Sequence, residues 1–340
     1  MRYSNRGKLL QQRERVTPLR DQIRAEYQFE SNIQHNFTSD SDQRTIVAVE
    51  DRYGFPVRLA MSHETGLLYL VDRLAGIDYQ RFYKDNTYRN LLNAFWSGEA
   101  QTDDKLVAKQ DTKSQQQAQK VLSAVSGLLN LPENATMLDI GGSTGSLAQL
   151  FSEQFHLQAI VLDPAEAELK LAAERGLQTR SGLFEEVEFA PDQRYDLIVL
   201  NQTIEHIYDM KVTFEKIHHL LKPNGYLIFD ILDFLAETEQ RGTGEAVARL
   251  DHPHFLFHEM AETFCQRIGV QLMTSIAYKS VCMLYVCRKA EVQPAAMFPP
   301  ETRQAIVRYL LNKATTWRET PRVLEYSVTE RIQRRLKNLF

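Results

Sequence analysis

A glycine-rich turn flanked by two acids is the part of the sequence best suited to bind a ligand. The turn reads Asp139-x-Gly141-Gly142-Ser143-x-Gly145, between a short apolar run and an amphipathic stretch. Glycine adopts positive φ and lets a ligand approach the backbone closely. A strand, a glycine turn and a helix form the first unit of a doubly wound nucleotide-binding sheet, whose ligand lies at the carboxyl end of the strand. The alternative is an ordinary tight strand-to-helix connection.

The two acids narrow the class of ligand. A dinucleotide fingerprint reads G-x-G-x-x-G, whereas here Asp139 precedes the turn. This acid would repel a phosphate but suits an amino group or a sulfonium. The next predicted strand ends in Asp163, which is placed to accept hydrogen bonds from both hydroxyls of a ribose. The pattern therefore favours a positively charged nucleoside compound over a nicotinamide dinucleotide.

Composition is that of an ordinary globular protein. The 340 residues are 43% hydrophobic and 25% charged, enough for one large domain with additions or for two domains. No apolar run approaches the roughly 20 residues that cross a bilayer, and the basic N-terminus lacks the apolar core of a secretory signal. Cys265, Cys282 and Cys287 form no C-x-x-C pair. We expect a cytoplasmic, reduced and metal-poor protein.

The net charge of -4 hides an uneven distribution. Residues 1–26 carry about +4 and residues 300–340 about +5, so the middle of the chain is near -13. A nucleic acid substrate requires a basic track along its phosphates. The acidic middle therefore argues against a nucleic acid partner.

Strands and helices alternate regularly in the second half of the chain. The closing pair of strands is joined by a short Lys-Ser turn and must be antiparallel, whereas a dinucleotide sheet ends on a parallel strand reached by a long crossover. The predicted class is α/β, a doubly wound seven-stranded sheet with an antiparallel last strand. We expect strands at 136–140, 157–163, 177–180, 196–200, 225–232, 270–278 and 281–288, and helices at 146–155, 164–175, 210–221 and 259–268.

Four segments divide the chain. Residues 1–44 read as a polar, exposed helical segment, 45–110 as a β-rich and helical accessory unit, 111–292 as the ligand-binding domain and 293–340 as a helical, basic tail. Within them, residues 101–119 read as a polar linker and 234–250 as a polar, mobile lid. The tail has an apolar stripe, which favours packing on the domain or on a second subunit over contact with a membrane surface. Its apolar residues are Ile306, Tyr309, Leu310, Ile332, Leu336 and Leu339.

These features resemble the class I S-adenosylmethionine-dependent methyltransferases, whose Rossmann-like sheet has a reversed seventh strand. Their first motif is D/E-x-G-x-G-x-G, and Ser143 stands at its middle glycine. Three more stretches match the family: Tyr195–Asp209 ("F-D-x-I…E-H-x-x-D"), Leu220–Ile228 ("L-L-K-P-G-G-x-L-x-I") and Asp251–Phe255 ("E-H-x-H-F"). The resemblance covers residues 137–290 well and 45–90 loosely.

The loose part resembles the N-terminal segment of a bacterial methyltransferase group, which is often a zinc ribbon. Thr65-Gly-Leu-Leu-Tyr and Arg81-Phe-Tyr…Tyr88-Arg89 carry this likeness. The cysteines of the ribbon are absent here, and Thr65 stands where one would precede Gly66. We therefore predict that apolar contacts hold this unit and that it binds no zinc.

The resemblance implies S-adenosylmethionine as cofactor and assigns its contacts. The glycine turn would hold the methionine end, Asp163 the ribose, residues after the third strand the adenine, and residues after the fourth strand would lie beside the transferable methyl. The implied cofactor residues are Asp139, Gly141, Gly142, Ser143, Gly145, Asp163, Leu183, Phe184, Asn201 and Gln202.

Histidine suits a general base at neutral pH, and His206 with Glu205 is the first candidate, with His254 as a further catalytic residue. The alternative is that the Glu-His pair only anchors the following helix. The cluster His252, His254 and His258 is read as a turn and helix cap rather than a metal site, so no metal is predicted. The expected substrate contacts are Tyr83, Tyr88, Arg89 and His252. The alternative interpretation of Tyr83, Tyr88 and Arg89 is aromatic packing with an exposed arginine.

The predicted function is O-methylation of a small molecule or of a sugar in a surface-glycan precursor. A non-catalytic member that binds the cofactor or a partner protein is the second hypothesis. A nicotinamide-dependent oxidoreductase is the third, opposed by Asp139 and by the closing hairpin. Expected partners are the small substrate and no nucleic acid, with the C-terminal helices as the surface for a homodimer.

Overall fold

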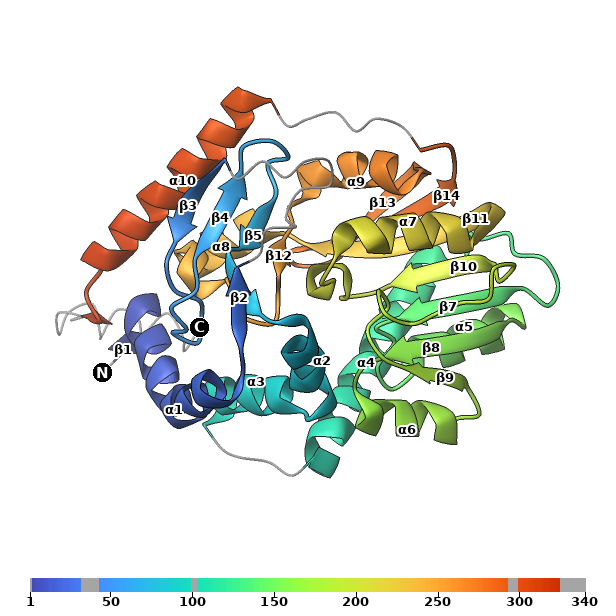
Figure 1. The fold of residues 1–340 in the computed structure, drawn as a ribbon, viewed down its shortest axis with the longest axis horizontal. Helices are drawn as coiled ribbons and strands as arrows, with labels where there is room; N and C mark the ends of the chain where they lie inside the picture. The colour runs from blue at the N-terminus through green and yellow to red at the C-terminus, as the bar shows by residue number, and fades with distance from the viewer. Residues whose placement is uncertain (1, 32–42, 99–102, 293–298, 325–340) are drawn as a thin grey trace, which may run out of the picture.

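A seven-stranded sheet forms one half of the molecule, seen at the right of Figure 1. The computed structural model describes residues 2–31, 43–98, 103–292 and 299–324. The strand order is β13-β14-β11-β10-β7-β8-β9, and β14 runs antiparallel to both neighbours. This confirms the predicted doubly wound sheet with an antiparallel last strand. Its strands are β7 (Thr136–Ile140), β8 (Gln158–Asp163), β9 (Gln178–Ser181), β10 (Tyr195–Leu200), β11 (Leu221–Leu232), β13 (Val270–Lys279) and β14 (Cys282–Lys289).

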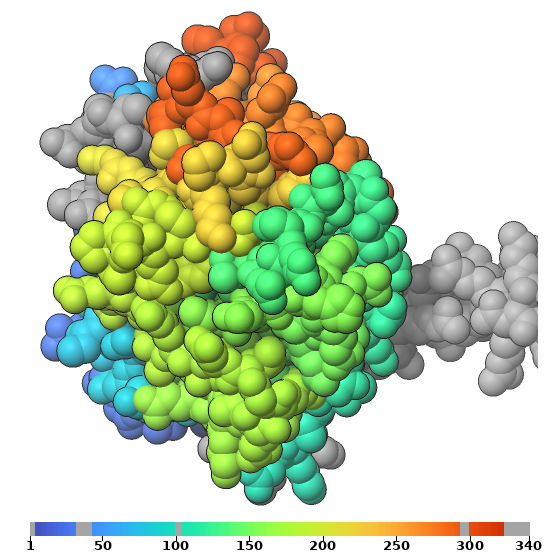
Figure 2. All heavy atoms as spheres, turned by 90° about the vertical axis from the view of Figure 1, so that its right-hand side faces the viewer, coloured from blue at the N-terminus to red at the C-terminus, as the bar shows by residue number. Residues whose placement is uncertain are grey.

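Helices cover both faces of this sheet. On β10, Leu197 and Val199 pack with one group of helices, and Ile198 and Leu200 pack with the other, as the two-residue period of a strand requires. The first group is α4 (Asp103–Val125), α5 (Ser146–Phe155) and α6 (Glu166–Glu174); the second contains α7 (Met210–Leu220) and α9 (Ala261–Ile268). Figure 2 shows the end of the molecule that these segments build, with the N-terminal unit only at its margin.

Helix α4 corrects the predicted linker at 101–119. It begins at Asp103, and its C-terminal half buries Ala118, Val121 and Val125 against the sheet. Gln and Lys are good helix formers, so the polar N-terminal half continues the helix although it lacks an apolar stripe of its own. Its polar side chains consequently reach the edge of the sheet where β7 ends.

The N-terminal unit is a second, smaller sheet with helices below it. Its order is β12-β5-β4-β3, so β12, from the middle of the ligand-binding segment, completes the sheet of the accessory unit. Helix α1 buries Leu9, Val16 and Ile23, which corrects the expectation of an exposed helix. The elements are β1 (Arg2–Tyr3), α1 (Asn5–Glu26), β2 (Phe29–Ser31), β3 (Arg44–Ala48), β4 (Leu59–Ser62), β5 (Leu68–Leu70), β6 (Asp72–Leu74), α2 (Gly76–Lys84), α3 (Thr87–Ser97), β12 (His254–Phe255) and β15 (Val323–Leu324).

The predicted lid at 234–250 is wrong, because this segment is packed between the two halves. It forms α8 (Phe234–Arg241) and the 3-10 helix η2 (Gly244–Ala246), and Leu250 is fully buried. The backbone N–H of Leu250 donates to the Asp51 carboxylate (2.9 Å), and the N–H of Arg52 donates to the carbonyl of Ala248 (2.7 Å). Buried apolar side chains and these bonds fix the segment to the accessory unit.

Helix α10 (Pro300–Glu319) lies across the small sheet, in contact with β3 (Figure 1). It buries Leu310, Ala314 and Trp317, and the half-buried Ile306 and Tyr309 pack on the same core. The remaining predicted stripe, Ile332, Leu336 and Leu339, lies outside the described residues. Among the described helices, none combines the length and the apolar character that a bilayer span needs.

Candidate functional site

A cavity of about 700 Å³ opens where β7, β8 and β10 end. This is the edge at which doubly wound sheets bind ligands, and the volume lies in the range of small-molecule sites. Its wall comes from the glycine turn, from α4, from the loops after β9 and β10, and from α2 and α3 of the N-terminal unit. The cavity is therefore built by both halves of the molecule.

The glycine turn has the tight geometry that its composition predicts. Gly141 has φ 70° and donates its N–H to the carbonyl of Leu162 (2.7 Å). A Cβ on Gly141 would collide with the Thr203 hydroxyl, and one on Gly142 would lie 2.7 Å from the Asp139 carboxylate. Ser143 also has positive φ (52°) and fits the turn at the position of the missing glycine.

Two buried carboxylates flank this turn. The Asp139 Oδ2 atom has no hydrogen-bond partner among the described residues, and burial, with repulsion from Asp163, raises the pKa of Asp139 to about 7. Asp163 accepts the N–H groups of Ser143 (2.9 Å) and Ala165 (2.8 Å), and burial and then Glu168 raise the pKa of Asp163 to about 7. Buried acids that resist ionisation gain most from a cationic ligand.

Glu168 on α6 links the accessory helices to the glycine turn. It is completely buried and accepts hydrogen bonds from Ser143 Oγ, Arg89 Nε and, at 3.4 Å, the Tyr88 hydroxyl. Arg89 is thus engaged in an ion pair beside the turn rather than presented alone to a substrate. The sequence analysis did not identify Glu168, because only the fold brings it next to Arg89.

We expect Glu168→Gln to destabilise the protein by about 3–5 kcal/mol, because it leaves the buried Arg89 without a counter-charge. The double variant Glu168→Gln/Arg89→Met should recover part of that loss, since it removes both charges. Urea unfolding of the wild type, both single variants and the double variant measures this coupling. If the stability losses of the two single variants simply add up in the double variant, Glu168 and Arg89 are not a coupled pair.

Helix α4 contributes a cation and several amides that the sequence analysis missed. Gln110, Lys113, Ser114 and Gln117 line the cavity, and Gln117 donates to the Tyr278 hydroxyl (2.7 Å). No ion pair links Lys113 to an acid among the described residues, and burial, followed by the charge of Lys109, lowers its pKa. Lys113 therefore presents an unpaired charge to a ligand anion.

The other predicted contacts line the same cavity. Leu183 and Phe184 follow β9 and are buried, giving it an apolar wall. Asn201 and Gln202 follow β10: Asn201 donates to the Tyr278 hydroxyl (3.2 Å), and the Gln202 N–H donates to Asp230 (2.5 Å). Tyr83, Tyr88 and Arg89 lie in the wall as well. The structure thus brings the predicted cofactor residues to one place, except Gly145, which lies behind the turn against Leu177 and Ala172.

His206, in the 3-10 helix η1 (Ile204–His206), is held in one orientation. Its Nδ1 lies 2.9 Å from the backbone carbonyl of Asp251 and 2.8 Å from the Tyr83 hydroxyl. A carbonyl only accepts, so we assign the proton to Nδ1, which leaves the lone pair on Nε2. Burial lowers the pKa of His206 to about 4. The ring is therefore neutral at physiological pH, with an unprotonated Nε2.

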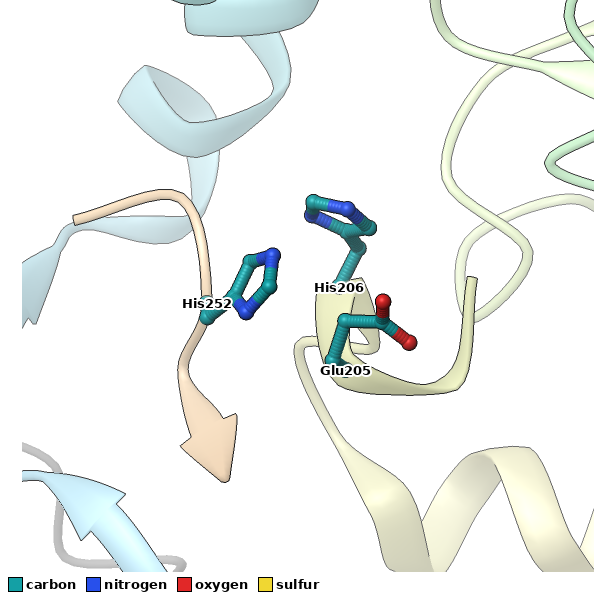
Figure 3. Close-up of side chains that lie close together, drawn as sticks. All are labelled: Glu205, His206 and His252. Carbon is teal, nitrogen blue, oxygen red and sulfur yellow. The ribbon is translucent and has the colours of Figure 1, made fainter. Parts of the chain in front are cut away.

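Figure 3 shows Glu205 and His206 on η1, with His252 facing them from the loop before β12. The His206 and His252 rings are perpendicular, with centroids 4.4 Å apart, and one ligand atom of each of the three residues lies within 4.8 Å of the others. Such a set could hold a metal ion, but Arg249 contacts His252 and places a positive charge there. That this protein binds no metal ion remains a prediction.

The remaining catalytic and substrate candidates divide between the cavity wall and the buried core. His254 is buried on β12, paired with Tyr69 of β5, and is absent from the described wall of the cavity. His252 packs behind His206 and does not belong to that wall either. Glu205 does line the cavity, and burial, with repulsion from Asp230, raises its pKa to about 8, so its carboxyl group is largely protonated at neutral pH.

Known proteins resemble the segment of the chain that builds most of the seven-stranded sheet. The model of a family described as "Methyltransferase domain" matches residues 112–269. Among curated proteins, the chain is 31% identical to malonyl-[acyl-carrier protein] O-methyltransferase of Priestia megaterium over 100 residues, 28% of this chain and 36% of that protein. It is 29% identical to ubiquinone biosynthesis O-methyltransferase of Bradyrhizobium diazoefficiens over 111 residues, 31% of this chain and 43% of that protein.

A further relative is named for a different activity. The mitochondrial arginine-hydroxylase NDUFAF5 of Homo sapiens is 32% identical over 102 residues, 29% of each chain. The chain spans less than half of the length of these relatives. These matches therefore do not carry over a substrate.

Proposed function

We propose that this protein is an S-adenosylmethionine-dependent O-methyltransferase, because residues 112–269 match the model of a methyltransferase domain family. The acceptor that we propose is a small molecule or a sugar of a surface-glycan precursor. One observation carries the proposal: a single cavity joins the acid-flanked glycine turn to the neutral imidazole of His206. Two of the relatives carry O-methyltransferase in their names, which supports the same reaction class.

The residues present suit this cofactor. The unpartnered Oδ2 of Asp139 fits a cationic amino group, and the glycine turn leaves room that a Cβ would fill. Asp163 lines the same cavity and would accept hydrogen bonds from the ribose hydroxyls. Leu183 and Phe184 offer an apolar wall against which the adenine ring could pack. Bound S-adenosylmethionine would supply an electrophilic methyl group on a sulfonium.

The chain's own residues would orient the acceptor and receive its proton. His206 Nε2 would accept the hydroxyl proton, a step worth about 10²–10⁴-fold in rate. Tyr83 and the Asp251 carbonyl keep the ring in the required tautomer. Orientation of the reacting groups can supply roughly 7–11 kcal/mol, and the wall that α2, α3 and α4 build would provide that constraint.

Thermal melting with S-adenosylhomocysteine and with NAD separates the proposed cofactor from a nicotinamide. S-adenosylhomocysteine should raise the melting temperature and NAD should not; the reverse result would overturn the proposal. Conversion of S-adenosylmethionine to S-adenosylhomocysteine is then screened with small alcohols, hydroxy acids and sugar nucleotides. Binding without turnover across the screen would favour the non-catalytic alternative.

We expect Lys113→Met to weaken S-adenosylhomocysteine binding by about 10-fold, because hydrogen bonds to charged groups contribute about 1.5–3 kcal/mol and this one is partly exposed. Calorimetric titration measures the change. Lys120→Met, on the same helix at the cavity margin, is the comparison and should change the affinity less. If both variants lose affinity equally, the effect comes from the overall positive charge of the helix and not from a contact of Lys113.

A further inference from the structure

Arg249 presents its guanidinium to the inner part of the cavity. It follows η2, lines the cavity together with Glu205 and His206, and its side chain is 16% exposed. Its polar contacts among the described residues are the His252 imidazole and, at 4.0 Å, the Asp251 carboxylate. A guanidinium has five N–H donors. Most of these donors are therefore available to a ligand.

The acids that line the same part of the cavity as Arg249 are Glu205, Glu237 and Asp251. Among the described residues, Arg249 makes no close ion pair with them. Glu237 forms its shorter ion pair with Arg241 (3.2 Å) and a longer one with Arg52 (4.0 Å). The Asp251 carboxylate lies 4.0 Å from Arg249 Nε, 4.0 Å from His206 Nδ1 and 3.8 Å from His252 Nε2. Arg249 is therefore a cation of this wall with N–H donors left for an anion.

The accessory unit fixes the position of Arg249. Leu250, the next residue, donates its N–H to Asp51, and the guanidinium of Arg52 donates to the carbonyl of Ala246 (3.1 Å). These bonds hold the segment on both sides of Arg249. A side chain fixed in this way loses less conformational entropy when it binds a ligand.

We propose that Arg249 binds a carboxylate of the methyl acceptor, so that the substrate class is hydroxy acids, sugar acids included. This assignment rests on the proposed function and deepens it. The planar guanidinium matches a carboxylate in a two-bond arrangement. A phosphate dianion is the poorer fit because the Arg52 donors are directed to backbone carbonyls of Ala246 and Val247.

Binding of matched probes to the protein saturated with S-adenosylhomocysteine tests the proposal. The probes are 4-hydroxybenzoate, the neutral 4-hydroxybenzamide of the same shape, and phenyl phosphate, each titrated at millimolar concentrations by calorimetry. We expect the carboxylate to bind at least about 10-fold more tightly than the amide, in line with a charge-assisted hydrogen bond. No discrimination, no binding of the carboxylate, or a preference for phenyl phosphate would overturn the proposal.

Variants assign the discrimination to one side chain. Arg249→Met should abolish it, Arg249→Lys should retain part of it, and Arg318→Met should leave it unchanged, because Arg318 is 61% exposed on α10 and pairs with Glu245. Each variant must still bind S-adenosylhomocysteine, which reports an intact fold and cofactor site. If the wild type itself fails to bind S-adenosylhomocysteine, the proposed function has failed; if it binds and Arg249→Met keeps the discrimination, only the carboxylate assignment has failed.

Discussion

Replacing His206 with asparagine is expected to lower kcat by about 10²–10⁴-fold, the range for loss of a positioned general base. The affinity for S-adenosylhomocysteine should change little, because His206 lies with Glu205 and Arg249 on the part of the wall that we assign to the acceptor. Stopped assays of S-adenosylhomocysteine formation, with an acceptor from the turnover screen, give kcat. Calorimetry gives the affinity on the same preparation.

Tyr83→Phe is the matched comparison for His206→Asn. It removes the hydroxyl 2.8 Å from Nδ1 and leaves the Asp251 carbonyl to hold the ring. Its loss of kcat should therefore be smaller than that of His206→Asn. A normal kcat in His206→Asn would mean that η1 only anchors the following helix, which is the alternative interpretation of the Glu-His pair.

The pH dependence separates the base from the cofactor site. The pKa of His206 is lowered to about 4 by burial, so its protonation should not reduce kcat between pH 8 and about 6 when the cofactor is saturating. Asp139 and Asp163 have pKa values near 7 and are protonated as the pH falls through that value. The affinity for the cationic cofactor should therefore decrease below about pH 7, while kcat at saturation does not.

Sequence patterns predicted the parts of the site that one segment contains. The glycine turn, its preceding acid and Asp163 follow from local spacing, because a strand, a turn and a helix place them at one sheet edge whatever else the chain does. The closing hairpin identified the reversed strand in the same way. These features require no knowledge of contacts between distant segments.

Residues contributed by distant segments could not be found in this way. Lys113 was hidden in a stretch read as a linker, since its helix shows an apolar stripe only near Ala118 and Val121. Glu168 becomes part of the site through Ser143, 25 positions away, and Arg89, 79 positions away. Arg249 was assigned to a mobile lid because the turn-forming Gly242 and Gly244 outweighed the buried apolar residues that follow them.

The replacement Asp139→Asn should have two opposite effects, a weaker cofactor site and a more stable empty protein. Loss of the charge should reduce the affinity for S-adenosylhomocysteine by about 10–100-fold, the value of a hydrogen bond to a charged group. The pKa of Asp139 is raised in the folded protein from 3.8 to about 7. The folded state thus holds the proton more tightly than the unfolded chain, and stability is lost as pH rises from 3.8 through 7.

The expected gain for Asp139→Asn at pH 8 is at most about 4 kcal/mol, about three pH units at 1.36 kcal/mol each, and it should vanish near pH 4. Asp196, at the opposite end of the same sheet, is the matched control, because its pKa is shifted in the opposite direction. Burial would raise the pKa of Asp196, but hydrogen bonds from Lys222 and Thr136 lower it. Asp196→Asn should therefore destabilise the protein at pH 8. Urea unfolding of both variants at pH 4.5 and at pH 8 measures these changes in stability. If Asp139→Asn is less stable than the wild type at pH 8, the Asp139 carboxylate already has a partner in the empty protein, and the assignment to a cationic ligand is wrong.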